Sequence, residues 1–237
     1  MNSPQQDPSQ PSFSGVRAPQ LAQAFEQALR SNRPSSVLDV GCGAGALVKA
    51  LCADDIPALG IEREPSEPAL ATGRTLAASA ELLPFADGSF DWVVMRHVPH
   101  HLEHPAAAFA EAWRVCKSGV QLAEPWYDTE VPSQRQALEI DRWLKHKDRR
   151  RGMFHADILS AKDLIALLPS DARCQVQTLA PLLPYPEATL EQELSAAAGD
   201  LPLSTVEQEQ RERFLAAARA DQVSMNGTLI LTARKPN

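Results

Sequence analysis

The strongest constraint on the fold comes from residues 37–45, which read VLDVGCGAG. Apolar residues surround Asp39 and then give way to glycines at alternate positions. Such an apolar run predicts a buried parallel strand, and the glycines permit the positive φ angles and close backbone approach of a ligand-binding turn. Residues 46–51 read as the start of a helix whose amide end faces that turn. The segment therefore predicts a strand, a cofactor-binding turn and a helix.

Two kinds of cofactor fit this turn, because Gly41-x-Gly43-x-x-Ala46 also satisfies a loose dinucleotide fingerprint. The expected second strand ends in Glu62, and a carboxylate at that place suits the ribose hydroxyls of NAD or of S-adenosylmethionine equally. Asp39 separates the two. A buried carboxylate is costly unless a cation or several donors meet it, and the ammonium of S-adenosylmethionine is such a cation, whereas a pyrophosphate would be repelled. The sequence favours S-adenosylmethionine.

Two further segments, residues 80–85 (AELLPF) and 87–95 (DGSFDWVVM), follow in order. With them the chain resembles the class I S-adenosylmethionine-dependent methyltransferases, in particular the group of ubiquinone and menaquinone biosynthesis C-methyltransferases and their small-molecule relatives. The resemblance covers residues 35–124 well and the remainder in outline. It implies a doubly wound, mostly parallel α/β sheet of Rossmann-like type, S-adenosylmethionine as cofactor, and methyl transfer to carbon or oxygen of a small molecule.

The resemblance also implies where the cofactor lies. Asp39 and the glycines would hold its methionine end, Glu62 its ribose, and residues 80–81 its adenine. The position that commonly contacts the adenine amino group is Ser79 here, so adenine recognition would fall on the backbone of Ala80 and on Glu81. The expected cofactor-binding residues are Asp39, Gly41, Cys42, Gly43, Gly45, Glu62, Arg63, Ala80, Glu81 and Arg96.

A histidine-rich segment, RHVPHHLEH over residues 96–104, follows the expected fourth strand. Methyl transfer needs an aligned nucleophile, a dry cavity and sometimes a base, and histidine has the ordinary pKa for proton removal near neutrality. In relatives the paired histidines lie near cofactor and substrate, so His100 and His101 are the expected catalytic residues. The competing interpretation is a helix cap or packing residue. No metal site is expected, because the cluster lacks familiar ligand spacing.

Strand and helix patterns alternate along the chain and predict a parallel sheet covered on both faces, with ligands at the carboxyl ends of its strands. The helix after the second strand is expected to be short, since Pro65 and Pro68 stand near its start. Expected strands are 37–40, 57–61, 77–79, 90–95, 120–123, 175–179 and 228–232, and expected helices are 21–29, 47–53, 70–76, 106–116 and 204–220, the last begun by a Ser204-x-x-Glu207 capping box.

Residues 1–15 are expected to form a disordered tail and residues 16–237 a single methyltransferase domain. Two insertions, at about 125–165 and 180–226, interrupt its strand pattern and are expected to form helices that build the substrate pocket as a lid. The alternative is a permanently packed helical pair. Glu124 and Asp128 at the end of the fifth strand could face a substrate, or could be solvated loop carboxylates.

The first insertion carries a basic run, formed by Lys145, Lys147, Arg149, Arg150 and Arg151. Such a run is usually a solvated helix face, although it could receive an anionic substrate. The chain as a whole has a formal charge of −7, which disfavours a nucleic-acid partner. No apolar run reaches the roughly 20 residues that span a bilayer.

The four cysteines show no metal or disulfide spacing, so reduced thiols and a cytoplasmic location are expected. The sequence predicts no oligomeric state. Three rival functions stay open. The first is a non-catalytic S-adenosylmethionine-binding or scaffold protein. The second is a macromolecule-directed methyltransferase, which is disfavoured because an Asn-Pro-Pro-Tyr type of motif is absent. The third is an NAD oxidoreductase, which Asp39 disfavours.

Overall fold

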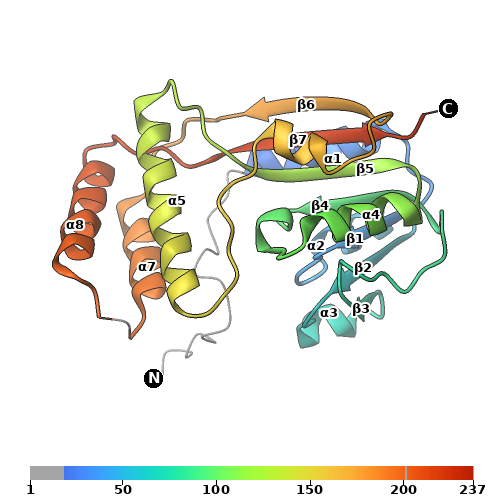
Figure 1. Ribbon diagram of the computed structural model, residues 1–237, viewed down its shortest axis with the longest axis horizontal. Coiled ribbons are helices and arrows are strands. Elements are labelled where there is room, and N and C mark those ends of the chain that lie inside the picture. The colour runs from blue at the N-terminus through green and yellow to red at the C-terminus, as the bar shows by residue number, and fades with distance from the viewer. Residues whose placement is uncertain (1–18, 201, 237) are drawn as a thin grey trace. The chain divides into compact units, whose positions relative to one another are not determined.

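A seven-stranded sheet organises the chain in the computed structural model, which describes residues 19–200 and 202–236 (Figure 1). The tail expected at residues 1–15 lies outside these ranges. The strand order is β3-β2-β1-β4-β5-β7-β6. The strands are β1 (Val37–Val40), β2 (Ala58–Glu62), β3 (Thr75–Ala77), β4 (Phe90–Arg96), β5 (Cys116–Trp126), β6 (Arg173–Leu179) and β7 (Gly227–Arg234).

The strands β3, β2, β1, β4 and β5 pair in parallel, and in this register Asp39 lies between Gly60 of β2 and Val94 of β4. β7 runs against β5, because Thr228 at the start of β7 bonds to the carbonyl oxygen of Glu124 while Lys235 just beyond its end bonds to that of Ser118. The sheet is therefore the mostly parallel, Rossmann-like sheet that the sequence predicted. Its parallel strands bring their carboxyl ends to one edge.

Most predicted helices and strands lie where the pattern placed them. The helices beside the sheet are α1 (Pro19–Ser31), α2 (Ala46–Ala53), α3 (Glu67–Ala71), α4 (Pro105–Val115), α6 (Ala161–Ala166) and the 3₁₀ helix η1 (Pro99–His101). α3 is short, as expected, but the helix predicted over residues 70–76 is wrong beyond Ala71. Gly73, with φ 64°, turns the chain so that β3 begins at Thr75, earlier than the predicted 77–79.

Two compact units share the chain. The sheet unit contains residues 23–125, 158–178 and 228–237, and the helical unit includes residues 126–157 and 179–227. The single domain with two insertions stays a prediction. The helices of the second unit are α5 (Pro132–Arg150), α7 (Glu187–Ala198) and α8 (Thr205–Arg219). No helix in residues 19–200 or 202–236 combines the length and apolar content needed to cross a membrane.

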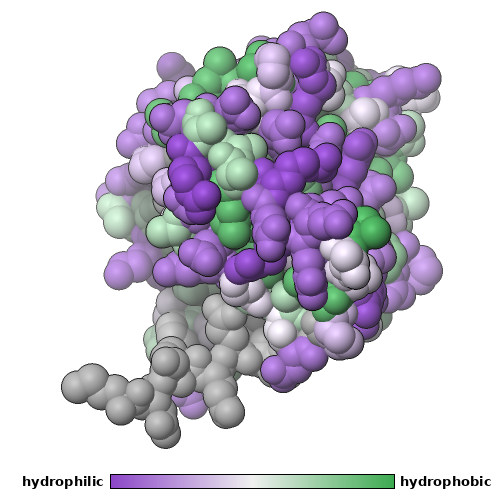
Figure 2. Space-filling model, turned by 90° about the vertical axis from the view of Figure 1, so that its left-hand side faces the viewer, coloured by the Kyte–Doolittle hydropathy of each residue, from purple (hydrophilic) through white to green (hydrophobic). Residues whose placement is uncertain are grey.

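The three helices of the helical unit have a hydrophobic core of their own. α5 contributes Ile140, Trp143 and Leu144, which pack with residues of α7 and α8 such as Leu194 and Phe214. The capping box predicted at Ser204 is present. The Ser204 hydroxyl accepts from the Glu207 amide, and the Glu207 carboxylate accepts from the Ser204 amide. The side of this unit that carries α8 presents a mainly hydrophilic surface (Figure 2). The larger apolar side chains of the unit are therefore mostly buried in its core.

The two lysines of the basic run do not lie on the solvated face that the composition indicated, whereas Arg149 and Arg150 are exposed. Lys145 is 1% exposed and Lys147 is fully buried. The Lys145 ammonium lies 3.1 Å from an Asp141 oxygen, and Lys147 donates to Glu207, which Arg150 also contacts at 3.1 Å. The bond from Lys147 lowers the pKa of Glu207 to about 2. These charges are thus neutralised within the helical unit.

We expect the amides of α5 to be strongly protected from hydrogen exchange in the absence of any ligand. A helix that buries Ile140, Trp143 and Leu144 opens only with the core around it, whereas a mobile lid opens easily. The measurement is exchange of the apo protein, repeated with S-adenosylhomocysteine. A large gain of protection confined to residues 127–154 would restore the lid interpretation; equal protection in both states would establish the permanently packed one.

Candidate functional site

The candidate site is the edge of the sheet where β1, β2, β4 and β5 end. Parallel strands deliver the residues that follow them to a common edge, so segments far apart in sequence meet there. The edge receives the glycine turn after β1, Glu62 at the end of β2, and Arg96 at the end of β4. All of these residues belong to the sheet unit.

The glycine turn after β1 depends on left-handed backbone angles. Gly41, Gly43 and Gly45 have φ of 71°, 54° and 76°, values that other residues adopt only with strain. A Cβ on Gly41 would lie 2.3 Å from a methyl of Val98, so packing requires glycine there. A Cβ on Gly43 would meet no described heavy atom within 4 Å, so it would enter the open space in front of the turn.

Asp39 is the most unusual charge of this edge. It is 1% exposed, and neither carboxylate oxygen has a hydrogen-bond partner among the described residues. Burial raises its pKa to about 7; the Glu62 carboxylate adds to this effect and the Arg96 guanidinium opposes it. A buried carboxylate without donors is costly, and a bound cation or donor would remove that cost. The geometry therefore fits the ammonium-bearing cofactor that the sequence favoured.

Glu62 connects the end of β2 to the glycine turn. One of its oxygens accepts from the Gly43 amide at 2.9 Å, and the other from the Arg63 amide at 3.0 Å. The amides of Gly41 and Cys42 both donate to the carbonyl of Ile61, at 2.8 and 3.0 Å. The carboxylate predicted to hold a ribose thus lies beside the turn and helps to shape it.

Cys42 turns its side chain away from the ligand side. It is buried, its sulfur lies 3.9 Å from the Thr75 hydroxyl, and a Cβ on Gly60 would come within 2.5 Å of it. Burial raises the pKa of the thiol to about 11, so the thiol stays neutral near pH 7. We therefore expect Cys42 to contact a cofactor through its backbone atoms.

The predicted adenine segment follows β3 on the same edge. The Ala78 amide donates to the carbonyl of Glu62 at 3.1 Å, which fastens the segment to the end of β2. The Ser79 hydroxyl accepts from the Glu81 amide at 3.1 Å, so it serves the local turn. Ala80 and Glu81 are half-buried beside it.

Arg96 ends β4 between two features of the site. Its guanidinium lies 5.8 Å from the centre of the Phe25 ring on α1, a cation–π distance. It also acts electrostatically on Asp39, where it favours the ionised carboxylate. Arg96 therefore acts on Asp39 from the end of β4, and its contact with a cofactor stays a prediction.

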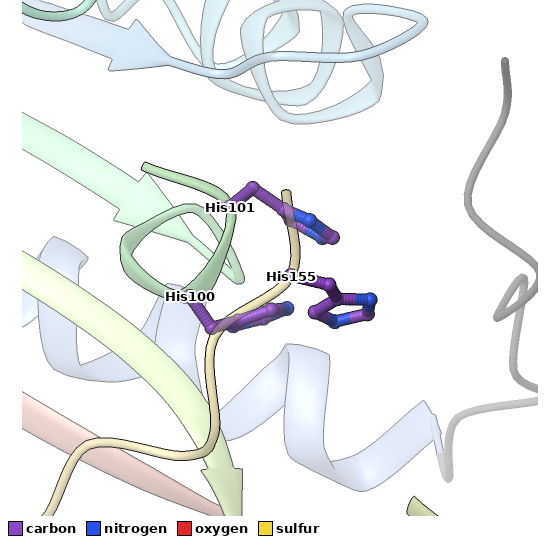
Figure 3. A group of neighbouring side chains, drawn as sticks. All are labelled: His100, His101 and His155. Atoms are coloured by element: carbon purple, nitrogen blue, oxygen red, sulfur yellow. The ribbon is translucent and has the colours of Figure 1, made fainter. Parts of the chain in front are cut away.

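The histidine segment begins with a strained residue. His97 has φ 57°, a left-handed angle that is rare outside glycine and often marks functional sites, and its amide donates to the carbonyl of Ala123 at 2.8 Å. The bend sends the chain into η1, which carries His100 and His101 with ring centres 4.2 Å apart (Figure 3). Figure 3 also labels His155. This residue belongs to the helical unit, in which its Nδ1 lies 2.8 Å from an Asp148 carboxylate oxygen.

His100 forms a buried pair with Glu124. Its Nδ1 lies 2.6 Å from a Glu124 oxygen, His100 is 5% exposed, and Glu124 is fully buried near the end of β5. The interpretation of Glu124 as a solvated loop carboxylate is therefore wrong. A carboxylate bonded to Nδ1 fixes the tautomer and orientation of an imidazole and makes its other nitrogen more basic. Asp128, in contrast, is a half-buried loop residue that accepts from the Glu130 amide at 3.0 Å.

The pairing itself was missed by sequence reasoning, which considered His100 and Glu124 separately. They are distant in sequence, and the only local signal was that each follows or ends a strand of the same parallel sheet. Neighbouring strands β4 and β5 bring them together. The sequence-predicted residues thus fall into two groups, the cofactor group around Asp39 and the histidine group around His100.

Comparison with known proteins identifies the same region. Residues 38–123 match the family profile described as "Methyltransferase domain". An uncharacterized methyltransferase of Mycolicibacterium gilvum is 35% identical over 96 residues, which cover 38% of this chain and 38% of that protein. Ajmaline N-methyltransferase of Rauvolfia serpentina is 30% identical over 102 residues, which cover 38% of this chain and 35% of that protein. The chain thus spans less than two fifths of the length of these relatives.

The fold similarity extends over nearly the whole chain. The crystal structure of YcgJ from Bacillus subtilis superposes with a TM-score of 0.64 over 91% of this chain and 99% of its own, at 17% sequence identity. At this identity the similarity concerns the fold, including the helical insertions, and the local match over residues 38–123 concerns the domain that carries the glycine turn and Glu62.

Proposed function

We propose that this chain, whose residues 38–123 form a methyltransferase domain of the class I, Rossmann-like type, transfers a methyl group from S-adenosylmethionine to a carbon or oxygen of a small molecule. One observation carries the proposal. Asp39 is buried with no hydrogen-bond donor among the described residues, beside a glycine turn whose front is open, and this combination suits a ligand that brings a cation and fits closely.

The residues around Asp39 would hold the cofactor. Asp39 would bind its ammonium, directly or through water, and the open face of Gly43 would accept its methionine portion. Glu62 would bind the ribose hydroxyls, because charge-assisted bonds of this kind are the strong ones. The backbone of Ala80, with Glu81, would flank the adenine. The bound sulfonium supplies an activated methyl group, so the protein contributes position and a dry site.

His100 is the proposed general base, with Glu124 as the residue that positions it. An acceptor carbon or hydroxyl must lose a proton around methyl transfer, and an imidazole held by a carboxylate has the basicity to take it. His101, whose ring centre lies 4.2 Å from that of His100 with the rings tilted by 47°, is the second candidate for a substrate contact. The small-molecule acceptor agrees with the name of the Rauvolfia relative, although that protein methylates nitrogen.

An anionic substrate loses much of its support, since the lysines of the basic run pair with Asp141 and Glu207 in the helical unit. A cytoplasmic location remains our proposal, and the four cysteines, all free thiols, agree with a reducing compartment. The rival function is a non-catalytic S-adenosylmethionine-binding protein. Such a protein would keep the glycine turn and Glu62 but has no need of the buried His100–Glu124 pair, so the pair favours an enzyme.

We expect S-adenosylmethionine and S-adenosylhomocysteine to bind, and NAD not to bind, because a pyrophosphate would approach the Asp39 carboxylate. Calorimetry with the three ligands measures this. Tight binding of NAD with no response to S-adenosylhomocysteine would overturn the proposal. Incubation with labelled S-adenosylmethionine and a metabolite extract, with His100→Gln as the matched inactive control, then tests transfer: a labelled product that the variant still forms at the full rate would remove the base from the proposal.

A further inference from the structure

A second cleft lies in the sheet unit, at the opposite edge of the sheet from Asp39. It has a volume of about 470 Å³ and collects the start of β4, the start of β5 and β6, the end of β7 and the end of α1. The parallel strand β4 separates the two places, since Trp92 lines this cleft and Arg96 ends the strand roughly 13 Å away at about 3.3 Å per residue. The residues around it are Ser31, Asn32, Trp92, Lys117, Ser118, Arg173, Arg234, Lys235 and Pro236.

The lining of this cleft is strongly basic in an acidic protein. It includes Lys117, Arg173, Arg234 and Lys235, and no carboxylate side chain is among the described residues that line it. The chain as a whole has a formal charge of −7. Lys117, Arg234 and Lys235 lie around one small volume and repel one another, and an anion placed between them would reduce that cost.

The cations on β7 are held in place by neutral groups. Arg234 donates to the side-chain oxygen of Asn32, and its guanidinium lies 5.9 Å from the centre of the buried Trp92 ring. The Lys235 ammonium donates to the carbonyl of Cys116 at 2.7 Å and lies 5.5 Å from the Trp113 ring. Neither contact neutralises charge. Both side chains are therefore oriented before a ligand arrives. Each uses one N–H donor in its described hydrogen bond and has further donors for a ligand.

Asp91 is the acid next to this cleft: it is not one of the lining residues, but the lining residue Ser118 donates to it. One of its oxygens accepts from the Ser35 amide at 2.8 Å, and the other from the Ser118 hydroxyl. Lys117 stands exposed at the start of β5, next to that serine. The positive charge of Lys117, Arg234 and Lys235 thus faces the cleft without a carboxylate between them in the described chain.

We propose that this cleft binds a small molecule that carries a phosphate or diphosphate group. Arginine and lysine together match phosphate oxygens, arginine through its planar pair of donors and lysine as a point charge. A volume of about 470 Å³ lies within the range of small-molecule sites. The site lies apart from the proposed cofactor residues, so both ligands can be bound together.

The test uses inorganic pyrophosphate as the probe, titrated by calorimetry into the full chain at low ionic strength. Pyrophosphate should bind the wild type, Arg234→Gln should weaken binding at least tenfold, and Lys117→Gln several-fold. Arg213→Gln is the matched control, because Arg213 is an exposed arginine of the helical unit paired with Glu139 and its loss changes the net charge equally. Thermal unfolding of each variant establishes that it is folded, and Lys117, which is exposed, can be replaced without disturbing the core.

Three results would overturn the proposal, two from this titration and one from its repetition with S-adenosylhomocysteine. The first is absence of pyrophosphate binding to the wild type, including the case in which only a DNA or RNA oligonucleotide binds through Lys117 and Arg234. The second is equal weakening by Arg213→Gln and Arg234→Gln, which would mean a general charge effect. The titration is repeated with saturating S-adenosylhomocysteine; an unchanged dissociation constant supports a separate site, and displacement of the probe contradicts it. Since no methyl transfer is measured, failure here is distinguishable from failure of the proposed function.

Discussion

Replacing Asp39 with asparagine should stabilise the ligand-free protein at pH 8 and weaken S-adenosylhomocysteine binding at least tenfold. Folding raises the pKa of Asp39 from 3.8 to about 7, chiefly through burial. The folded state therefore resists ionisation of this group. Its contribution to stability is most favourable below about pH 4 and is lost as the pH rises toward 7, by up to about 4 kcal/mol. Asparagine cannot ionise and escapes that loss.

The measurement is urea unfolding of wild type and Asp39→Asn at pH 4 and pH 8, together with calorimetry of S-adenosylhomocysteine. We expect the variant to gain about 1 to 3 kcal/mol relative to wild type at pH 8 and little at pH 4, since the amide also lacks a buried partner. Asp171→Asn, at an exposed turn, is the matched control and should change neither quantity. Opposite outcomes, a destabilised variant at pH 8 or unchanged affinity, would mean that Asp39 is structural.

Replacing Gly43 with valine should lower the affinity for S-adenosylhomocysteine at least a hundredfold, while the protein stays folded. The valine side chain would enter the open space in front of the turn, where no described atom lies within 4 Å of the position that a Cβ would take. That space is what the methionine portion of the cofactor would fill. The left-handed φ of 54° adds about 1 to 2 kcal/mol of backbone strain, which a folded domain tolerates.

Gly88→Val is the control for that strain. Gly88 has φ 60° near the start of β4, and a Cβ there would meet only the flexible side chain of Lys117 at 3.4 Å. Both variants should lose similar stability in urea unfolding, but only Gly43→Val should lose affinity in calorimetry. Full affinity in Gly43→Val would place the cofactor elsewhere, and loss of affinity in both variants would attribute the effect to strain.

Local pattern was sufficient for β1, the glycine turn and the capping box of α8. β1 and the glycine turn follow from nine consecutive residues, and the capping box at Ser204 follows from four. Such features are local because φ preferences, burial of an apolar run and helix capping act over a few residues. The match of residues 38–123 to a methyltransferase domain agrees with that local signal.

Local pattern was insufficient where a side chain's partner is distant in sequence. The sequence indicates a surface charge at Lys147, but in the folded chain α8 places Glu207 beside it. The sequence likewise leaves Glu124 open as a loop acid, but the pairing of β4 and β5 places His100 beside it. The end of α3 was misplaced because its apolar residues fit either a helix or the strand that follows Gly73. In each case the decisive contact joins elements that only the folded chain brings together.

The sequence by itself determined that a buried acid precedes a glycine turn in a parallel sheet. The apolar run that buries the strand and the glycines that permit the turn are neighbouring residues, so the prediction needs no distant contact. Tertiary structure decided which charges are neutralised and which are left unpaired. In the part of the chain that the structure describes, Asp39 has no hydrogen-bond donor, the α5 lysines are paired, and Arg234 and Lys235 lie together at the far edge of the sheet. Charge balance depends on distances between distant segments, and those distances exist only after folding.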